Sequence, residues 1–249
     1  MPGGNLGKLL FRYNRVPLGV VLRLRICADI ASGMAAIHKN KDGKRLVHGD
    51  IKPENILLSG DLRCKIGDFG SALLVNLTGN TETADRGDQD TTVYYQAPER
   101  LQDPFCRVKT YHDTYSYGLV IHGVLTREIP NKGVIRDRYV DAIKDGKRPK
   151  TDHIDIFEMS VGGNSELELV EKLKETMESC WNQDKDKRPT MDVVFKVLHQ
   201  LVGKQNPDHM STAVDQVQKE YPFLNPGLKD QICHSLSSFN ATTGKFPAG

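Results

Sequence analysis

The sequence predicts a mainly α-helical protein with short β-hairpins. Two observations favour this fold class: four segments carry apolar residues at helical spacing, and three short apolar runs are bounded by polar turns. The expected helices are residues 18–39, 113–127, 167–181 and 191–202, and the expected strands are residues 45–48, 55–58 and 63–66.

The first expected helix, residues 18–39, has a single apolar face. Its apolar residues recur at intervals of three or four positions: Leu22, Ile26, Ile30, Met34 and Ile37. A stripe of this kind packs a helix against the rest of a domain, so we expect it to lie in the core and to have no catalytic role.

The extended runs come next along the chain. Ser59-Gly60-Asp61 separates residues 55–58 from residues 63–66 and predicts a hairpin turn. Residues 72–96 are polar and rich in Thr, Asp and Gly, which predicts a long loop. A loop of this length inside a compact domain is usually functional.

The three later helices again show amphipathic patterns, and Thr190 is the expected N-cap of the last one. From residue 204 onward the pattern weakens and prolines recur. Residues 204–249 are therefore expected to form an extended or partly disordered C-terminal tail.

Composition narrows the class of protein. With 249 residues, 38% apolar and 27% charged, the chain is typical of a globular protein and is long enough for one large domain or two small ones. A net charge of +2 favours neither nucleic acid nor an anionic membrane as the main partner. No stretch reaches the ~18 apolar residues of a membrane span.

The cysteines indicate a reducing compartment. No CxxC pair occurs and the N-terminus does not resemble a signal peptide, so we expect free thiols and a cytoplasmic location. The cysteines are scattered along the chain, at Cys27, Cys64, Cys106, Cys180 and Cys233.

The strongest chemical signal is residues 48–55, His-Gly-Asp-Ile-Lys-Pro-Glu-Asn. On an extended loop, the Asp50 carboxylate can accept a proton from an alcohol and orient that alcohol. Lys52 projects the same way, so its ammonium group can neutralise a transferring phosphoryl group. The amide oxygen of Asn55 can ligate a hard cation such as Mg²⁺.

A second signal, Asp68-Phe69-Gly70, follows the expected strand at residues 63–66. The glycine lets the backbone turn, and a carboxylate held at that turn can chelate Mg²⁺ together with Asn55. The two acids then have separate tasks, since Asp68 acts on the metal and Asp50 acts on the nucleophile.

The order HxDxKxxN followed by DFG resembles the catalytic core of eukaryotic protein kinases. The likeness covers residues 1–203 and implies the C-terminal lobe of a kinase domain. Further motifs resemble those of the family and keep its order: Ala97-Pro98-Glu99, the stretch from Asp113 to Gly118, Cys180-Trp181 and Arg188-Pro189. Each tripeptide alone is a weak signal, but their succession is specific.

The resemblance implies roles for five residues. Asp50 would be the catalytic base that accepts the proton of the substrate hydroxyl, and Lys52 would steady the γ-phosphate of ATP. Asn55 and Asp68 would hold Mg²⁺, and Leu57 would lie beneath the adenine ring. ATP and Mg²⁺ are thus the expected cofactors, and a protein bearing a serine or threonine hydroxyl is the expected substrate.

The resemblance also implies structural contacts. His48 and Phe69 would stack in the internal spine of a kinase, and Asp113 would anchor the catalytic loop through backbone N–H groups. Simple core packing is the alternative explanation for these three residues. Glu99 would pair with Arg188.

The chain departs from the family pattern in what it lacks. It contains no Gly-x-Gly-x-x-Gly loop and no Val-Ala-x-Lys, which belong to the N-terminal lobe and hold the phosphates of ATP. We therefore expect the β-sheet of the N-lobe to be missing, so that the chain represents a truncated kinase domain with little or no activity alone. Apolar groups that would face an N-lobe then need a partner to cover them, or they favour aggregation.

Two substitutions within the motifs also matter. Gly49 stands where many kinases carry an arginine that receives an activation-loop phosphate. Phosphorylation is therefore not expected to be an obligatory switch through this site. Tyr115 replaces the usual tryptophan, an aromatic exchange that we expect to be tolerated.

The motifs point to one kinase group. Lys52-Pro53-Glu54 resembles serine/threonine kinases, whereas Cys180-Trp181 with Arg188-Pro189-Thr190 resembles tyrosine kinases and their relatives. The combination favours tyrosine-kinase-like serine/threonine kinases similar to the receptor-interacting kinases of signal transduction, with dual specificity left open.

Two other functions remain. Small-molecule phosphotransferases for aminoglycosides or choline share the His-Gly-Asp and Asn logic, but they are not expected to carry Glu99 with Arg188. A non-catalytic, pseudokinase-like scaffold would bind partners through its helices, yet it has no need of Asp50, Lys52, Asn55 and Asp68.

Overall fold

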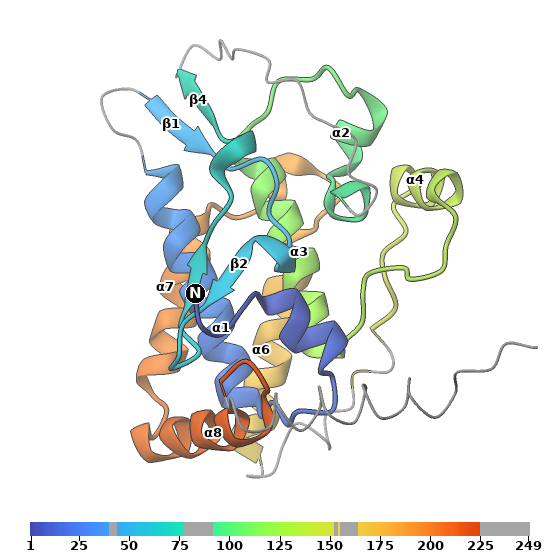
Figure 1. Ribbon diagram of the computed structural model, residues 1–249. Helices are drawn as coiled ribbons and strands as arrows, with labels where there is room; N and C mark the ends of the chain where they lie inside the picture. The colour runs from blue at the N-terminus through green and yellow to red at the C-terminus, as the bar shows by residue number, and fades with distance from the viewer. Residues whose placement is uncertain (40–43, 77–91, 152–153, 155–163, 225–249) are drawn as a thin grey trace, which may run out of the picture.

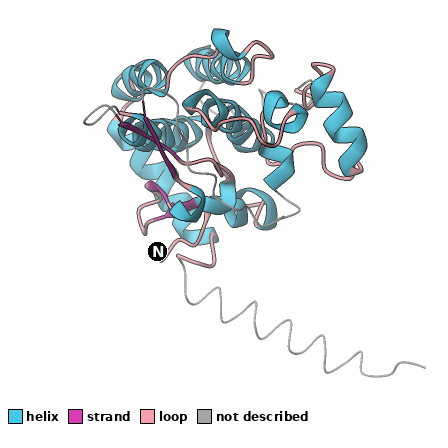
Figure 2. Ribbon diagram, turned by 90° about the horizontal axis from the view of Figure 1, so that it is seen from above, coloured by secondary structure: helices cyan, strands magenta, loops and turns pink. Residues whose placement is uncertain are grey.

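The computed structural model describes residues 1–39, 44–76, 92–151, 154 and 164–224. Helices dominate this part of the chain, and its strands form two antiparallel pairs (Figures 1 and 2). The mainly helical fold that the sequence predicts is confirmed.

Four long helices build the core: α1 (Val20–His38), α3 (Thr110–Thr126), α6 (Asn164–Cys180) and α7 (Met191–Gly203). α1 packs against α7, and α3 packs against α6. Residues along nearly the whole length of α3 are buried, so this helix runs through the interior (Figure 1). All four match helices expected from the apolar stripes.

The other helices were not expected, because each offers too few apolar positions for a clear pattern. They are α2 (Pro98–Gln102), α4 (Arg136–Lys144), α8 (Pro207–Glu220), the π-helix η1 (Lys8–Arg12) and the 3₁₀ turns η2 (Pro53–Asn55), η3 (Phe69–Ser71), η4 (Thr92–Tyr95) and η5 (Lys185–Lys187). α8 lies where the sequence predicts an extended or partly disordered tail, so that expectation is wrong for residues 207–220.

One of the two strand pairings was predicted from the sequence and the other was not. β2 (Ile56–Leu58) and β3 (Cys64–Ile66) form the expected hairpin, with Leu57 opposite Lys65. β1 (Lys44–Val47) pairs instead with β4 (Leu73–Asn76). β4 lies within the stretch predicted as a loop, because its partner is distant in sequence. Most of that stretch, residues 77–91, lies outside the described residues.

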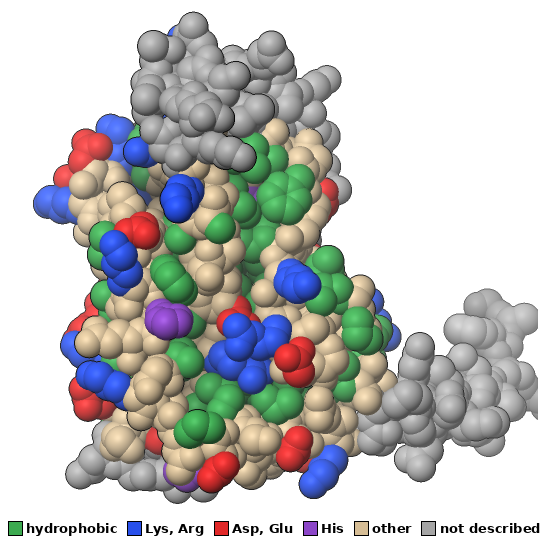
Figure 3. Space-filling view, turned by 90° about the vertical axis from the view of Figure 1, so that its left-hand side faces the viewer, with side chains coloured by type: hydrophobic (Ala, Val, Ile, Leu, Met, Phe, Trp, Pro, Cys, Tyr) green, Lys and Arg blue, Asp and Glu red, His purple; other side chains and the backbone are tan. Residues whose placement is uncertain are grey.

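Charged side chains join the hairpin to the first helix. Arg63 in the hairpin lies 2.9 Å from Asp29 of α1, and the Asp29 carboxylate also accepts the backbone N–H of Cys64 at 3.1 Å. Figure 3 shows the face on this side of the molecule, where basic and acidic side chains are interspersed. This interspersed charge agrees with the nearly balanced charge of the sequence.

The first residues of the chain are tied to the end of α3 by Arg127. Its guanidinium donates to the carbonyl oxygens of Leu9, Leu10, Tyr13 and Val16 at 2.7–3.2 Å. Burial lowers the pKa of Arg127 to about 10, so the side chain still carries its charge at neutral pH. These hydrogen bonds fix the π-helix η1 to the C-terminal end of α3.

No described helix is long and apolar enough to cross a membrane. Four cysteines fall within the described ranges, and none of these is in a disulfide, as the sequence predicts. Thr190 does occupy the N-cap position of α7, although its side chain makes no capping hydrogen bond.

Tyr115 lies in the core close to two guanidinium groups. The ring centroid is 5.2 Å from Arg148 and 4.9 Å from Arg188, and both distances are within the range of cation–π contacts. Its hydroxyl is buried without a hydrogen-bond partner in the described part of the chain, and burial raises its pKa to about 12. The ring therefore contributes to stability, whereas the hydroxyl does not.

Replacing Tyr115 with phenylalanine is expected to leave the free energy of unfolding unchanged or to raise it by about 1 kcal/mol, because a desolvated, unpaired hydroxyl is removed. Urea denaturation followed by circular dichroism measures this. Tyr117→Phe is the matched control, since the Tyr117 hydroxyl donates to the Cys27 carbonyl at 2.8 Å and its loss should cost about 1 kcal/mol. Equal losses in both variants would contradict the expectation.

Candidate active site

The loop from β1 to β2 brings three predicted site residues together. Lys52 Nζ lies 3.0 Å from Asp50 Oδ2, and Asn55 Nδ2 donates to the same oxygen at 2.9 Å. Asn55 also donates to the backbone carbonyl of Asp50 at 2.8 Å. The 3₁₀ turn η2 makes this possible, because it folds Asn55 back over the start of the loop.

The two carboxylate oxygens of Asp50 have different surroundings. Oδ2 is held by Lys52 and Asn55, whereas Oδ1 is buried and has no hydrogen-bond partner within the described ranges. A carboxylate with one oxygen fixed and the other unsatisfied is oriented to accept a hydrogen bond from an incoming hydroxyl.

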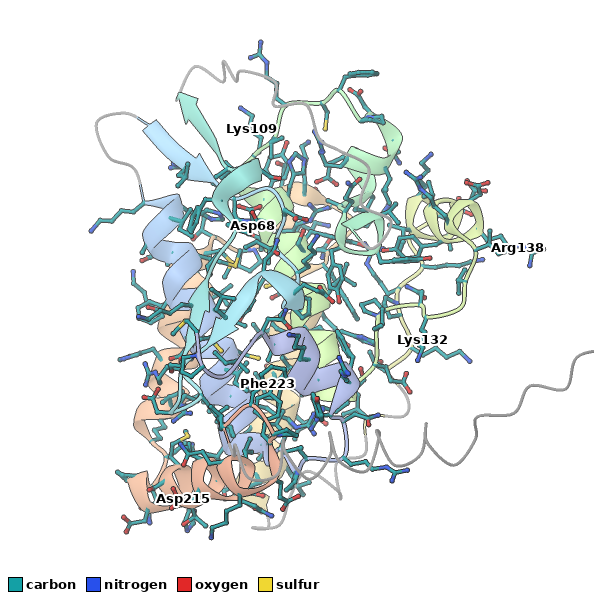
Figure 4. The ribbon with its side chains drawn as sticks, viewed as in Figure 1. Asp68, Lys109, Lys132, Arg138, Asp215 and Phe223 are labelled. Carbon is teal, nitrogen blue, oxygen red and sulfur yellow. The ribbon has the colours of Figure 1, made fainter. Side chains whose placement is uncertain are left out.

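Asp68 adopts an uncommon backbone conformation beside this loop. Its φ of 57° and ψ of 71° are left-handed, which costs an L-residue about 1–2 kcal/mol. The turn is supported by the Gly70 N–H, which donates to the Asp68 carboxylate at 3.3 Å. Figure 4 marks Asp68, which lies in the chain between β3 and β4. Such strain persists chiefly where the local geometry serves a function.

Asp68 is connected to Asn55 through the backbone. The N–H of Gly67, which directly precedes Asp68, donates to the carbonyl of Asn55 at 2.8 Å. The exposed Asp68 carboxylate and the Asn55 amide oxygen are hard ligands of the kind that Mg²⁺ prefers. The Asn55 amide nitrogen already faces Asp50, so its oxygen faces the other way, and this donor set suits Mg²⁺ bound together with phosphate oxygens.

Leu57 lies in β2 next to Gly67. A side-chain carbon added at Gly67 would come within 3.0 Å of the Leu57 side chain, so only glycine fits there without movement. Glycine at position 67 therefore leaves room for the Leu57 side chain. Asn5 forms an isolated β-bridge with Leu57 on its other side.

His48 and Phe69 make the contact that the resemblance implies. Their ring centroids are 5.1 Å apart in an edge-to-face arrangement. His48 Nε2 lies 2.9 Å from the carbonyl of Gly67, and His48 Nδ1 accepts the N–H of Asp50 at 3.3 Å. The ring therefore bridges the catalytic loop and the DFG turn as a donor through Nε2 and an acceptor through Nδ1.

Asp113 anchors the catalytic loop from below, as predicted. Its carboxylate accepts the backbone N–H of His48 at 2.8 Å and that of Gly49 at 2.7 Å. His38, at the end of α1, contributes a third contact, with Nε2 at 2.8 Å from Asp113 Oδ2. His38 was not among the residues expected from the sequence, although a polar residue that ends an apolar helical stripe was the available signal.

Gly49 has a conformational reason to be glycine. Its φ of 75° lies in the left-handed region, where a side chain is strained. That conformation directs the Gly49 N–H to the Asp113 carboxylate. The residue thus favours the anchored loop geometry as well as lacking a phosphate-binding side chain.

Glu99 and Arg188 form the ion pair that the resemblance implies, with two hydrogen bonds of 2.6 and 2.9 Å. Burial raises the pKa of the Glu99 carboxyl, but the hydrogen bond and the charge of Arg188 outweigh it, so the pKa lies below its ordinary value. His112 Nε2 is 3.4 Å from Glu99, and burial lowers the pKa of His112 to about 4, so its ring is neutral. The pair joins α2 to the segment before α7.

The helical fold, the loop of residues 48–55 and the Asp68-Phe69-Gly70 turn together define a kinase-like class of protein. A family model described as protein kinase domain matches residues 1–200. The chain belongs to the protein kinase domain family.

Similar proteins include serine/threonine kinases. The human receptor-interacting serine/threonine-protein kinase 1 is 28% identical over 239 residues, covering 92% of this chain and 33% of that protein. The probable serine/threonine-protein kinase roco6 of Dictyostelium discoideum is 31% identical over 208 residues, covering 78% of this chain and 9% of that protein.

One further relative is named differently. A protein of Arabidopsis thaliana named as a probable inactive receptor kinase is 29% identical over 217 residues, covering 80% of this chain and 31% of that protein. The chain spans a third or less of the length of these three relatives.

Proposed function

We propose that residues 1–203 are the C-terminal lobe of a serine/threonine protein kinase, which transfers the γ-phosphate of ATP to protein hydroxyls. The observation that carries this proposal is the divided environment of Asp50, in which Lys52 and Asn55 hold one oxygen while the other has no partner in the described residues. The names of the human and Dictyostelium relatives support serine or threonine as the acceptor.

Each residue of the loop has a task in this reaction. The substrate hydroxyl donates to Asp50 Oδ1, which orients its oxygen towards the γ-phosphorus and takes its proton. The Lys52 ammonium, 3.0 Å from Asp50, balances the charge that develops on the transferring phosphoryl group. Asn55 and Asp68 would hold Mg²⁺, which neutralises phosphate charge when bound, and Leu57 would lie beneath the adenine.

Activity of the chain alone is expected to be weak. The 249 residues include neither the glycine-rich loop that covers the phosphates of ATP nor the lysine of Val-Ala-x-Lys that pairs with them. Phosphoryl transfer depends mainly on positioning and charge stabilisation, so the absence of these groups removes much of the catalysis.

An assay that supplies an upper lobe tests the proposal. The N-lobe of the human receptor-interacting kinase, joined in frame before Met1, should give incorporation of labelled phosphate into serine or threonine of a general protein substrate. Asp50→Asn should lower kcat by about 10²–10⁴-fold, the usual contribution of a positioned base. The control is Asp215→Asn on the exposed side of α8, which makes the same chemical change away from the site.

Two outcomes would contradict the proposal: a chimera that folds but transfers no phosphate, or activity that is the same in Asp50→Asn and Asp215→Asn. Transfer to a small aminoglycoside or choline in place of protein would favour the other phosphotransferase class.

A second function is a non-catalytic scaffold, which one observation favours. Phe69 is 46% exposed at the surface that would face an N-lobe, so an apolar ring is open to a partner there. Thermal unfolding of the chain with and without Mg·ATP separates the two functions, since a scaffold without a nucleotide site shows no shift.

A further inference from the structure

The chain beyond the kinase-family match folds back onto the beginning of the chain. The match ends at residue 200, and α8 with the residues that follow it extends to Leu224. Tyr221 ends α8 and is fully buried, and its hydroxyl donates to the backbone carbonyl of Gly3 at 3.0 Å. We refer to residues 207–224 as the C-terminal clasp.

An aromatic cluster forms the centre of this contact. Tyr13, Tyr221 and Phe223 lie pairwise with ring centroids 5.5–5.9 Å apart, and Lys8 Nζ lies 4.7 Å from the centroid of Phe223. Figure 4 shows Phe223 between α8 and the helix η1 near the N-terminus. Gly4, with φ of 69°, lies beside this cluster, and a side-chain carbon added to it would be in van der Waals contact with Phe223 and the Tyr221 hydroxyl, at 3.5 Å from each.

A second anchor lies on the β2–β3 hairpin. Gln218 Nε2 donates to the carbonyl of Gly60 in the hairpin turn at 2.7 Å. Val214 and Val217 of α8 are buried in the core, and α8 also contacts α1. The clasp therefore contacts both the hairpin turn and the first residues of the chain.

The segment held by the clasp acts as an additional strand on β2. The Gly3 N–H donates to the Leu58 carbonyl at 3.0 Å, and the Leu58 N–H donates to the Gly4 carbonyl at 2.9 Å. The bridge between Asn5 and Leu57 continues this pairing. Gly3 has no room for a side chain, because an added carbon would lie 2.8 Å from Leu58 and from the Ser59 carbonyl.

These contacts connect the clasp to Leu57, the residue expected to lie beneath the adenine ring. The Tyr221 hydroxyl fixes Gly3, residues 3–5 line the edge of β2, and β2 carries Leu57. We propose that Tyr221 is a positioning residue: the C-terminal clasp holds residues 3–5 against β2 and thereby sets the affinity of the site for an adenine nucleotide. This proposal rests on the proposed function, in which Leu57 lies beneath the adenine ring.

Hydrogen exchange of the full 249-residue chain tests the clasp. Tyr221→Phe keeps the ring and removes only the hydroxyl, so the fold should persist. The amides of Gly3 and Leu58 should exchange about 2- to 10-fold faster, the range for one lost hydrogen bond. The Gly67 amide, which donates to Asn55 in the β2–β3 hairpin, should be unchanged. The matched control is Tyr13→Phe, which removes a hydroxyl of the same cluster that does not bond Gly3.

A nucleotide titration of the same chain tests the link to the site. The methyl signals of Leu57 should shift on addition of Mg·ATP, and the Kd should rise about 2- to 10-fold in Tyr221→Phe but not in Tyr13→Phe. If Tyr221 had only a structural role, Tyr221→Phe would lower the melting temperature without changing the Kd for Mg·ATP.

The outcomes are distinguishable. Unchanged exchange at Gly3 and Leu58 in Tyr221→Phe overturns the clasp, and faster exchange with an unchanged Kd overturns its positioning role. Faster exchange in the variant, together with no Leu57 shift in the unaltered chain, overturns the nucleotide role but leaves the clasp itself standing. The proposed function is overturned separately, by an N-lobe chimera that folds but transfers no phosphate.

Discussion

Replacing Arg188 with methionine is expected to lower the free energy of unfolding by about 3–5 kcal/mol, because it leaves a largely buried carboxylate without its cation. The Arg188 side chain is fully buried and Glu99 is 22% exposed, so water compensates little. Arg188 also donates to the carbonyls of Asn182 at 2.8 Å and Tyr111 at 3.2 Å, and these acceptors lose their partner too. Urea unfolding at neutral pH measures the loss.

Two further variants make this measurement specific. Lys187→Met changes the adjacent residue, whose side chain is 72% exposed, and should alter stability by no more than about 0.5 kcal/mol. The double variant Glu99→Leu with Arg188→Met removes both charges and should recover part of the loss. A loss under about 1 kcal/mol in Arg188→Met, or a double variant as unstable as the sum of the two single variants, would mean that the pair is not the main bond between α2 and the segment before α7.

How well the fold follows from the sequence depends on whether a pattern is local. The stripe from Leu22 to Ile37 predicts α1, because a helix repeats its environment every three to four residues. The hairpin around Ser59 also forms within a few residues. The pairing of β1 with β4 joins residues such as Val47 and Leu73, and nothing in either segment alone indicates the other.

The candidate site shows the same division. Asp50, Lys52 and Asn55 lie within one short loop, so spacing and side-chain chemistry suffice to group them. The contacts of Asp113 with the loop, and of Glu99 with Arg188, were expected only from the resemblance to kinases, because they join distant parts of the chain.

The clasp was missed because its anchors are polar or small. Gly3 accepts the Tyr221 hydroxyl through its backbone carbonyl, and Gly60 accepts Gln218 in the same way. Backbone acceptors exist at every residue, so no side-chain pattern reveals which one is used. α8 itself offers few apolar residues, and its stability in this position depends on tertiary packing.

Asp113→Asn is expected to lower the free energy of unfolding by about 3 kcal/mol. In the N-lobe chimera it should lower kcat, with a smaller effect on the KM for ATP. The Asp113 carboxylate accepts from three donors: the N–H groups of His48 and Gly49, and His38 Nε2. An amide presents one oxygen and one NH₂ group, so one of its ends must face an N–H donor and repel it. The catalytic loop then loses the anchor that holds Asp50 in place.

The matched control is Asp192→Asn on the exposed face of α7, which loses only a surface ion pair with Lys196 and should cost no more than about 0.5 kcal/mol while leaving kcat unchanged. A double-mutant cycle with His38→Ala isolates the buried contact, since His38 should contribute to stability only while Asp113 is present to receive its hydrogen bond. Additive losses would show that His38 acts independently of Asp113. An unchanged kcat in a folded Asp113→Asn variant would show that the loop keeps its catalytic geometry without this anchor, so that its other contacts suffice to hold it.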